Sequence, residues 1–198
     1  RRSVVSLSAK LEVWMRPTCV ILGLLTLMSG ANADPLARPS VLESGLVGRW
    51  TGTLQYRDYQ SDKLTSLPQT KEIQALADKA TIIAISSFDD GPKSGTVYIT
   101  SLSLFDPRSD AVQTTSFRRG ETAEIGKSTA VTARYTDDTH WTVVYLQTGS
   151  DDDKPAEIRT TETRDGTKLT SVEEYRRPDD HSKVWNFRNQ TILTLDKR

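Results

Sequence analysis

Reactive side chains and long apolar runs are scarce in this chain. Its 198 residues include one cysteine, Cys19, and two histidines, His140 and His181. Basic and acidic residues number 26 each, so the chain lacks the positive charge typical of nucleic-acid-binding proteins. The longest apolar run, residues 19–28, is about half as long as a membrane-spanning helix requires. The sequence therefore predicts no nucleic-acid partner and no permanent membrane anchor.

Residues 15–33 have the features of an export signal. A positive charge at Arg16 precedes the apolar run, and Ala31 and Ala33 form an A-x-A cleavage site before Asp34. Such a segment is removed during export. The sequence therefore predicts a mature protein that works in the periplasm or is secreted.

Residues 1–14 precede this signal, and we interpret them as an over-extended reading frame with Met15 as the true start. Removal of residues 1–33 takes away four of the 26 basic residues and one of the 26 acidic ones, which leaves 165 residues with a net charge of −3. That length suits one domain with its own core. The only cysteine is removed as well, which excludes cysteine nucleophiles, thiolate metal sites and iron–sulfur clusters.

The mature chain begins with a linker and a helical turn. Residues 34–39 contain two prolines and little periodicity, which is typical of a linker. Ser40 and Glu43 have the spacing of a capping box, so we expect a short helical turn there. From Gly48 onward apolar and polar residues alternate, as a half-buried strand requires. One face of this first strand carries Trp50, Gly52, Leu54 and Tyr56.

The rest of the chain is rich in threonine, valine, isoleucine and aromatic residues, with turn residues about every ten positions. Further strands are predicted near 71–77, 80–88, 95–105, 111–118, 129–136, 140–147, 156–164, 168–176 and 183–195. The segment Leu67–Lys79 also permits one amphipathic helical turn. Because an open sheet of this size would leave two exposed edges, closure is expected. The sequence predicts an all-β domain over residues 40–198, an antiparallel up-and-down meander closed into an eight- to ten-stranded barrel.

A short motif, Gly48-Arg49-Trp50, lies in the first strand after the helical turn, and this order resembles the calycin superfamily, which includes the lipocalins. In that family a G-x-W motif packs its tryptophan over the closed end of the barrel, often beside an arginine of the last strand. The resemblance implies structural roles for Gly48 and Trp50. It makes Arg188 the first candidate for the arginine and Arg198 the second, and it implies a calycin-like barrel that encloses a cavity.

Aromatic residues of two later strands are the candidate lining of such a cavity. Trp141 and Tyr145 share one face of their strand, and Trp185 and Phe187 share one face of the last strand. Asn189 interrupts that apolar face, where it either orients a ligand or marks the mouth of the barrel. The predicted ligand-binding residues are Trp141, Tyr145, Trp185, Phe187 and Asn189.

The two histidines give little support for catalysis. His140 and His181 each lie near acidic turn residues, and the chain has no G-x-S-x-G motif. The sequence therefore predicts no catalytic residue, no cofactor and no metal ligand. Two alternatives would use a histidine, a hydrolase and a haem-binding barrel that resembles nitrobindin. The run Asp151–Asp153 is interpreted as a charged hairpin tip, because it lacks the ligand spacing of a calcium loop.

These observations lead to one functional hypothesis and one main alternative. The hypothesis is an exported, lipocalin-like module that binds a small, largely apolar molecule without catalysis. The alternative is a structural or interaction protein whose barrel is filled by its own side chains. The basic pairs Arg118-Arg119 and Arg176-Arg177 either are solvated or face an anionic head group at the barrel mouth. The sequence assigns no oligomeric state.

Overall fold

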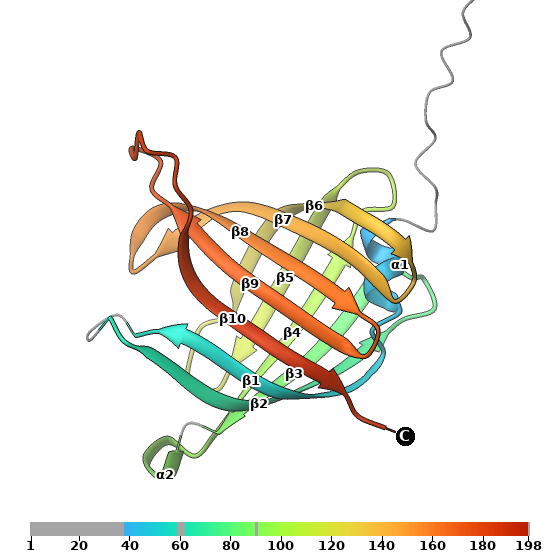
Figure 1. Cartoon of the computed structure of the whole chain (residues 1–198), viewed down its shortest axis with the longest axis horizontal. Coiled ribbons are helices and arrows are strands. Elements are labelled where there is room, and N and C mark those ends of the chain that lie inside the picture. The colour runs from blue at the N-terminus through green and yellow to red at the C-terminus, as the bar shows by residue number, and fades with distance from the viewer. Residues whose placement is uncertain (1–37, 59–61, 90, 198) are drawn as a thin grey trace, which may run out of the picture. The chain divides into compact units, whose positions relative to one another are not determined.

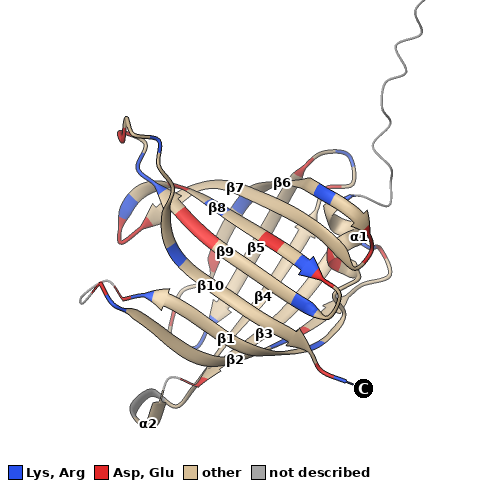
Figure 2. Cartoon of the chain, in the orientation of Figure 1, with Lys and Arg blue, Asp and Glu red and all other residues tan. Residues whose placement is uncertain are grey.

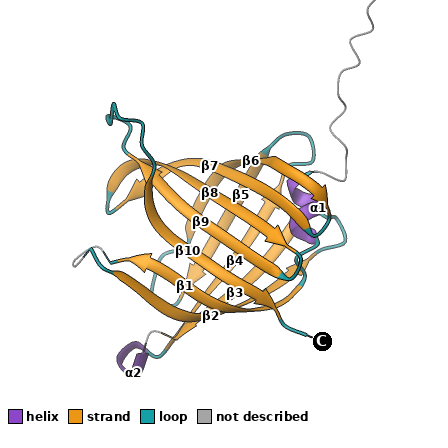
Figure 3. Cartoon of the chain, in the orientation of Figure 1, coloured by secondary structure: helices purple, strands orange, loops and turns teal. Residues whose placement is uncertain are grey.

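Ten strands and two short helices make up the part of the chain that the structure, a computed structural model, describes: residues 38–58, 62–89 and 91–197 (Figures 1 and 3). The helices are α1 (Pro39–Ser44), which precedes the first strand, and α2 (Gly91–Ser94), which lies between β3 and β4. The strands are β1 (Gly48–Arg57), β2 (Leu64–Ala75), β3 (Thr81–Asp89), β4 (Thr96–Phe105), β5 (Ala111–Arg118), β6 (Glu124–Asp137), β7 (His140–Asp151), β8 (Lys154–Asp165), β9 (Lys168–Arg176) and β10 (Asn186–Leu195).

The strands close into a barrel. Each strand pairs with the next along the chain, and β10 pairs with β1. In the closing pair Trp50 faces Leu195, and on its other side Trp50 faces Lys71 of β2. Closure leaves none of the ten described strands with an unpaired edge. The predicted fold class, an all-β antiparallel meander closed into a barrel after a short helical turn, is confirmed.

The strand bounds agree with prediction in some places and differ in others. β5 and β9 have the predicted bounds, whereas β2 begins at Leu64, well before the predicted start at 71. Most of the segment Leu67–Lys79 belongs to β2, with buried residues at the alternate positions Gln69 and Ile73, so the helical alternative is wrong. The last strand begins at Asn186, not at 183.

Helix α1 forms without the predicted capping box. Its N-cap residue is Arg38, and no side chain caps the helix. Pro39 occupies the first helical position, where a missing N–H is tolerated. Glu43 is therefore not a cap residue, and its side chain is buried.

Apolar side chains fill the end of the barrel next to α1, which we call the closed end. Trp50 is fully buried and donates its indole N–H to the Leu46 carbonyl oxygen at 2.8 Å. Burial of each large side chain of this kind stabilises the fold by about 1.5–3 kcal/mol. The buried core comprises Leu42, Leu46, Trp50, Ile73, Ile82, Phe105, Val112, Ala130, Trp141, Val143, Leu169 and Leu193.

The opposite end, which we call the open end, carries the β1–β2, β3–β4, β5–β6, β7–β8 and β9–β10 connections (Figure 1). Asp152 and Asp153 form the β7–β8 turn with φ values of 50° and 56°. A two-residue hairpin of type I′ requires positive φ at both positions. The predicted hairpin tip is confirmed for Asp152 and Asp153, whereas Asp151 is the buried last residue of β7. Figure 2 shows that charged residues gather toward strand ends and connections.

Residues 1–37 lie outside the described residues. The export signal at 15–33, the over-extended frame at 1–14 and most of the linker at 34–39 therefore stay predictions. Within the described ranges, no helix has the length and apolar character needed to cross a membrane.

Candidate ligand site inside the barrel

The strand register decides which side chains face the interior. Successive residues of a strand point to opposite faces, and directly paired residues share a face. The buried residues Trp50 and Leu193 mark the inward positions. The hydroxyl residues that the register turns inward include Ser86, Ser101, Ser103, Thr114, Ser116, Ser128, Thr160, Ser171 and Thr191.

These inward hydroxyl residues are half-buried, in contrast to the fully buried core at the closed end. Half-buried apolar residues share the wall with them, among them Leu54, Leu67 and Phe88. A barrel of about eight strands already holds one small ligand, and the diameter grows with strand number. The inner wall therefore offers a mixed polar and apolar surface for a small molecule.

Five polar residues separate this wall from the filled closed end, and we call them the floor cluster. Glu43 projects from α1, and Tyr145 of β7 donates its hydroxyl hydrogen to Glu43 Oε1 at 2.6 Å. Glu162 of β8 and Lys71 of β2 both lie close enough to Glu43 for their charges to affect its pKa. Gln69 is the next inward residue of β2. Glu43, Gln69 and Glu162 are only 8%, 4% and 7% exposed.

Burial and a neighbouring carboxylate both disfavour ionisation of Glu43. Burial raises the pKa of Glu43 well above its ordinary value of 4.5, and the charge of Glu162 raises it further. The hydrogen bond from Tyr145 and the charge of Lys71 act in the opposite direction and have smaller effects. Burial also raises the pKa of Tyr145, with the charges of both carboxylates adding to the effect. The surroundings of Glu43 therefore favour its protonated, neutral form.

The floor cluster is chemically incomplete. Within the described part of the chain, Gln69 Oε1 and Glu162 Oε1 are buried and have no hydrogen-bond partner. An unpaired buried acceptor costs roughly 1–3 kcal/mol. Both oxygens belong to inward-facing residues, so a molecule that carries N–H or O–H groups would satisfy them from the interior.

A second polar cluster, which we call the rim cluster, lies at the open end. Asp151 is buried and pairs with Arg177 at 3.0 Å and with Arg188 at 3.2 Å. Asn189 donates to Glu173 Oε1 at 2.9 Å. Burial raises the pKa of Glu173, and the charge of Arg188 opposes that shift. These pairs hold the β9–β10 connection against β7.

Three of the five predicted ligand-binding residues face inward. Tyr145 belongs to the floor cluster, and Asn189 belongs to the rim cluster. Trp141 is fully buried in the core, where its indole N–H is donated to the Asp138 carbonyl oxygen at 3.2 Å. Trp141 therefore packs the closed end and lies outside the half-buried part of the wall.

The other two, Trp185 and Phe187, lie on the outer face, which corrects their predicted place in the lining. The β9–β10 register shifts between Phe187 and Asn189, so that Phe187 is opposite Glu174 and Asn189 is opposite Glu173. Glu173 faces the interior and Glu174 faces outward. One extra residue in a strand reverses the face of every residue beyond it.

Trp185 contributes to the outer surface of the barrel. The guanidinium carbons of Arg159 and Arg176 lie 4.5 Å and 4.6 Å from the centre of its ring system. Arg159 also pairs with Glu174, and Arg176 pairs with Glu157. An outer groove of about 510 Å³ runs beside this cluster, and Glu157 and Arg176 in its lining pair with each other.

Arg164, not Arg188, is the arginine that packs on the motif tryptophan. Its guanidinium carbon lies 5.8 Å from the centre of the Trp50 ring. Arg188 belongs to the rim cluster at the opposite end, and Arg198 lies outside the described residues. Gly48 has a φ of 145° and, with any side chain, would crowd a leucine of β10 at 2.9 Å. The expected roles of Gly48 and Trp50 fit this geometry, whereas the role expected of Arg188 does not.

The two histidines lie at opposite ends of the barrel, and neither faces the interior. His140 alternates with the inward Trp141 and lies 2.9 Å from Asp137 and 3.4 Å from Asp165. His181 is exposed in the β9–β10 connection. This geometry adds no support to the hydrolase or haem alternatives.

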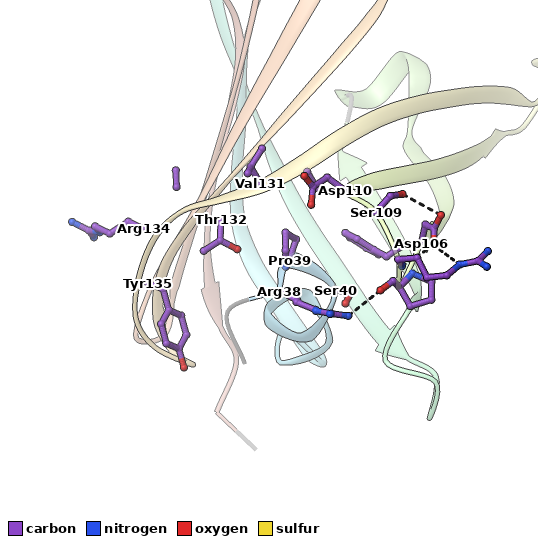
Figure 4. Close-up of a pocket in the computed structure, with 15 residues that line it drawn as sticks. Arg38, Pro39, Ser40, Asp106, Ser109, Asp110, Val131, Thr132, Arg134 and Tyr135 are labelled. Carbon is purple, nitrogen blue, oxygen red and sulfur yellow. Dashed lines mark hydrogen bonds and ion pairs between the residues drawn. The ribbon is translucent and has the colours of Figure 1, made fainter. Parts of the chain in front are cut away.

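A second outer groove, of about 520 Å³, lies beside α1 at the closed end (Figure 4). Arg38 donates to the Pro107 carbonyl oxygen at 2.9 Å, and Ser109 donates to Asp106 at 3.1 Å. These polar groups of the groove therefore already have hydrogen-bond partners. The unpaired acceptors of the floor cluster make the interior the stronger candidate site.

The sequence prediction contains only Tyr145 of the five residues of the floor cluster. The sequence predicts Glu43 to be a helix-capping residue. Glu162 lies in a strand rich in polar residues, and no pattern distinguishes it from its neighbours. A local signal does exist in β2, where Gln69 and Lys71 share the alternating face of the apolar Ile73. A polar pair on an apolar face marks a candidate interior site.

Comparison with known proteins identifies the fold. No protein-family model matches the chain, and no curated protein sequence matches it. A solved structure that does match is the crystal structure of Rv2717c from M. tuberculosis, with a TM-score of 0.55 and 13% identity over 80% of this chain and 98% of that chain. At that identity the likeness shows the fold alone. The class is a closed, ten-stranded antiparallel β-barrel.

Proposed function

We propose that this chain is a non-catalytic binding module of the calycin type, which holds one small, largely apolar molecule inside its barrel. The half-buried inner wall beyond the floor cluster carries the proposal. Ligand sites are mostly apolar surfaces with a few polar groups that fix orientation. Leu54, Leu67 and Phe88 supply the apolar surface, and the floor cluster supplies the polar groups.

The alternative, a barrel filled by its own side chains, is supported by the packing of the closed end. Trp50 and Trp141 are fully buried there, whereas the inward residues Ser101 and Thr160 are half-buried farther along the wall. Close packing leaves few gaps in a filled core. The contrast therefore favours a ligand site over a purely structural role.

We also propose that the barrel works outside the cytoplasm after removal of residues 15–33. The signal pattern before Asp34 and the lack of cysteine from Asp34 onward support this proposal. N-terminal sequencing of the exported protein should give Asp34 as the first residue. Recovery of Arg1 from that fraction would contradict the proposal.

Two neighbouring threonines allow a matched test of interior binding. Thr160 pairs with Tyr145 and faces inward, whereas Thr161 pairs with Val144 and Val172 and faces outward. The probe is N-phenyl-1-naphthylamine, a neutral molecule whose fluorescence rises in an apolar site. We expect saturable binding to the wild type and to Thr161→Trp, and loss of binding in Thr160→Trp, whose indole would occupy the interior.

Both variants should keep the circular dichroism spectrum of the wild type. Absence of saturable probe binding to the wild type would contradict the proposal. Equal binding to both tryptophan variants would also contradict it, because the probe would then occupy the outer surface.

A further inference from the structure

We infer that the floor cluster recognises a protonated amine, so that the molecule held in the barrel is a small amphipathic amine. This inference rests on the proposed function, because it assigns the head group of the molecule that the interior binds. Its basis is the charge balance of the floor, its two unpaired oxygens and the apolar wall beside it.

The floor cluster contains more acidic than basic groups. Glu43 and Glu162 lie together, and Lys71 is the basic side chain that acts on Glu43. Arg164 is the next inward residue after Glu162, but it donates to the Gly45 carbonyl oxygen at 2.9 Å in the closed end. A ligand ammonium would add a positive charge beside these two carboxyl groups and would favour the ionised form of Glu43.

The unpaired atoms of the floor match the donors of an ammonium group. A primary ammonium has three N–H donors and no acceptor. Glu162 Oε1 and Gln69 Oε1 are buried acceptors without a partner among the described residues, and the Glu43 carboxyl is adjacent to Glu162. A hydroxyl group donates only one hydrogen bond. A carboxylate donates none and would add a further negative charge beside the acidic groups of the floor.

The wall next to the floor suits an apolar chain attached to that ammonium. Gln69 faces Gly52 on one side and Phe88 on the other. The next inward pair toward the open end is Leu54 with Leu67, and both are half-buried. A ligand with its amine at the floor would therefore place its apolar part against these side chains.

Three probes with the same chain and different head groups test this inference by isothermal titration calorimetry: n-octylammonium, 1-octanol and octanoate. We expect the wild type to bind n-octylammonium at least about tenfold more tightly than either of the others. Glu162→Gln should weaken n-octylammonium about tenfold and change 1-octanol by less than about twofold. Glu174→Gln, which removes a carboxylate from the outer face, is the matched control and should bind as the wild type does.

Gln69→Leu is an independent second variant, which removes the other unpaired oxygen and should also weaken n-octylammonium selectively. The inference fails if 1-octanol or octanoate binds the wild type as tightly as the amine. It fails as well if both floor variants retain the wild-type affinity for the amine. If none of the three probes binds while N-phenyl-1-naphthylamine does, the inference alone fails. If that probe does not bind either, the proposed function fails with it.

Discussion

Arg164 lies over the indole ring of Trp50, with its guanidinium carbon 5.8 Å from the ring centre. The same guanidinium group donates to the Gly45 carbonyl oxygen at 2.9 Å and to the Asp138 carbonyl oxygen at 3.3 Å, while Nε donates to the Gly166 carbonyl oxygen at 3.1 Å. One side chain of β8 therefore connects the end of α1, the β6–β7 turn and the β8–β9 turn over the core tryptophan.

Arg164→Ala should lower the free energy of unfolding by about 3 kcal/mol, because hydrogen bonds to a charged group each contribute roughly 1.5–3 kcal/mol. Arg49→Ala is the matched control within the Gly48-Arg49-Trp50 motif. Arg49 is exposed and forms only surface ion pairs, so its loss should cost less than about 1 kcal/mol. Urea unfolding measures both values, and equal losses would show that Arg164 has no special role in the closed end.

Gly52 is a position where the barrel has no room for a side chain. A Cβ there would lie 2.0 Å from the Ile192 carbonyl oxygen, which is a backbone atom and moves only with its strand. Gly52→Ala should destabilise the protein by about 3 kcal/mol, the upper part of the usual range for overpacking. Gly126→Ala is the control, because its Cβ would meet Gln147 at an ordinary 3.5 Å and should cost less than about 1 kcal/mol.

Stability should fall as the pH rises above the ordinary pKa of Glu43. Burial and Glu162 raise the pKa of Glu43 in the folded protein above 4.5, so between these two values the folded state holds a proton that the unfolded state has lost. Burial also raises the pKa of Glu173, and this shift changes stability with pH in the same direction. The wild type should therefore melt at a higher temperature at about pH 5 than at about pH 7.5.

Glu43→Gln should reduce the difference in melting temperature between these two pH values, because an amide does not titrate. Glu174→Gln, on the outer face, should leave it unchanged. A wild-type melting temperature that rises from about pH 5 to about pH 7.5 would contradict the buried carboxyl pair.

Trp185 tests whether the register shift between Phe187 and Asn189 places the residues before it on the outer face. Because its ring lies outside the barrel between Arg159 and Arg176, Trp185→Ala should keep the wild-type affinity for N-phenyl-1-naphthylamine within about twofold. The loss of the two cation–π contacts should cost about 1–2 kcal/mol of stability. A large loss of probe affinity in a folded variant would place Trp185 in the interior instead.

The fold could be predicted from the sequence because its signals are local. Alternation from Gly48 and turn residues such as Asp152 are visible within a few positions of the chain. The face of Trp185 could not be predicted, because the register shift between Phe187 and Asn189 reverses it. No residue pattern in the strand marks that shift, and a single extra residue is enough to produce it.

The assembly of the floor cluster could not be predicted for a different reason, although the polar pair in β2 is a local signal. Glu43, Lys71 and Glu162 come from α1, β2 and β8, and only closure of the barrel brings them together. The arginine at Trp50 shows the same limit. The family resemblance places this arginine in the last strand and so selects Arg188. The arginine that packs on Trp50 is Arg164, which comes from β8.

Native mass spectrometry of the wild type and of Thr160→Trp, each purified from cells that export the protein, tests the central claim most directly. We predict that the wild type carries the added mass of one small molecule and that Thr160→Trp, with its interior occupied, carries none. A wild-type mass equal to that of the polypeptide alone, with no adduct formed on addition of N-phenyl-1-naphthylamine or n-octylammonium, would contradict a ligand site inside the barrel.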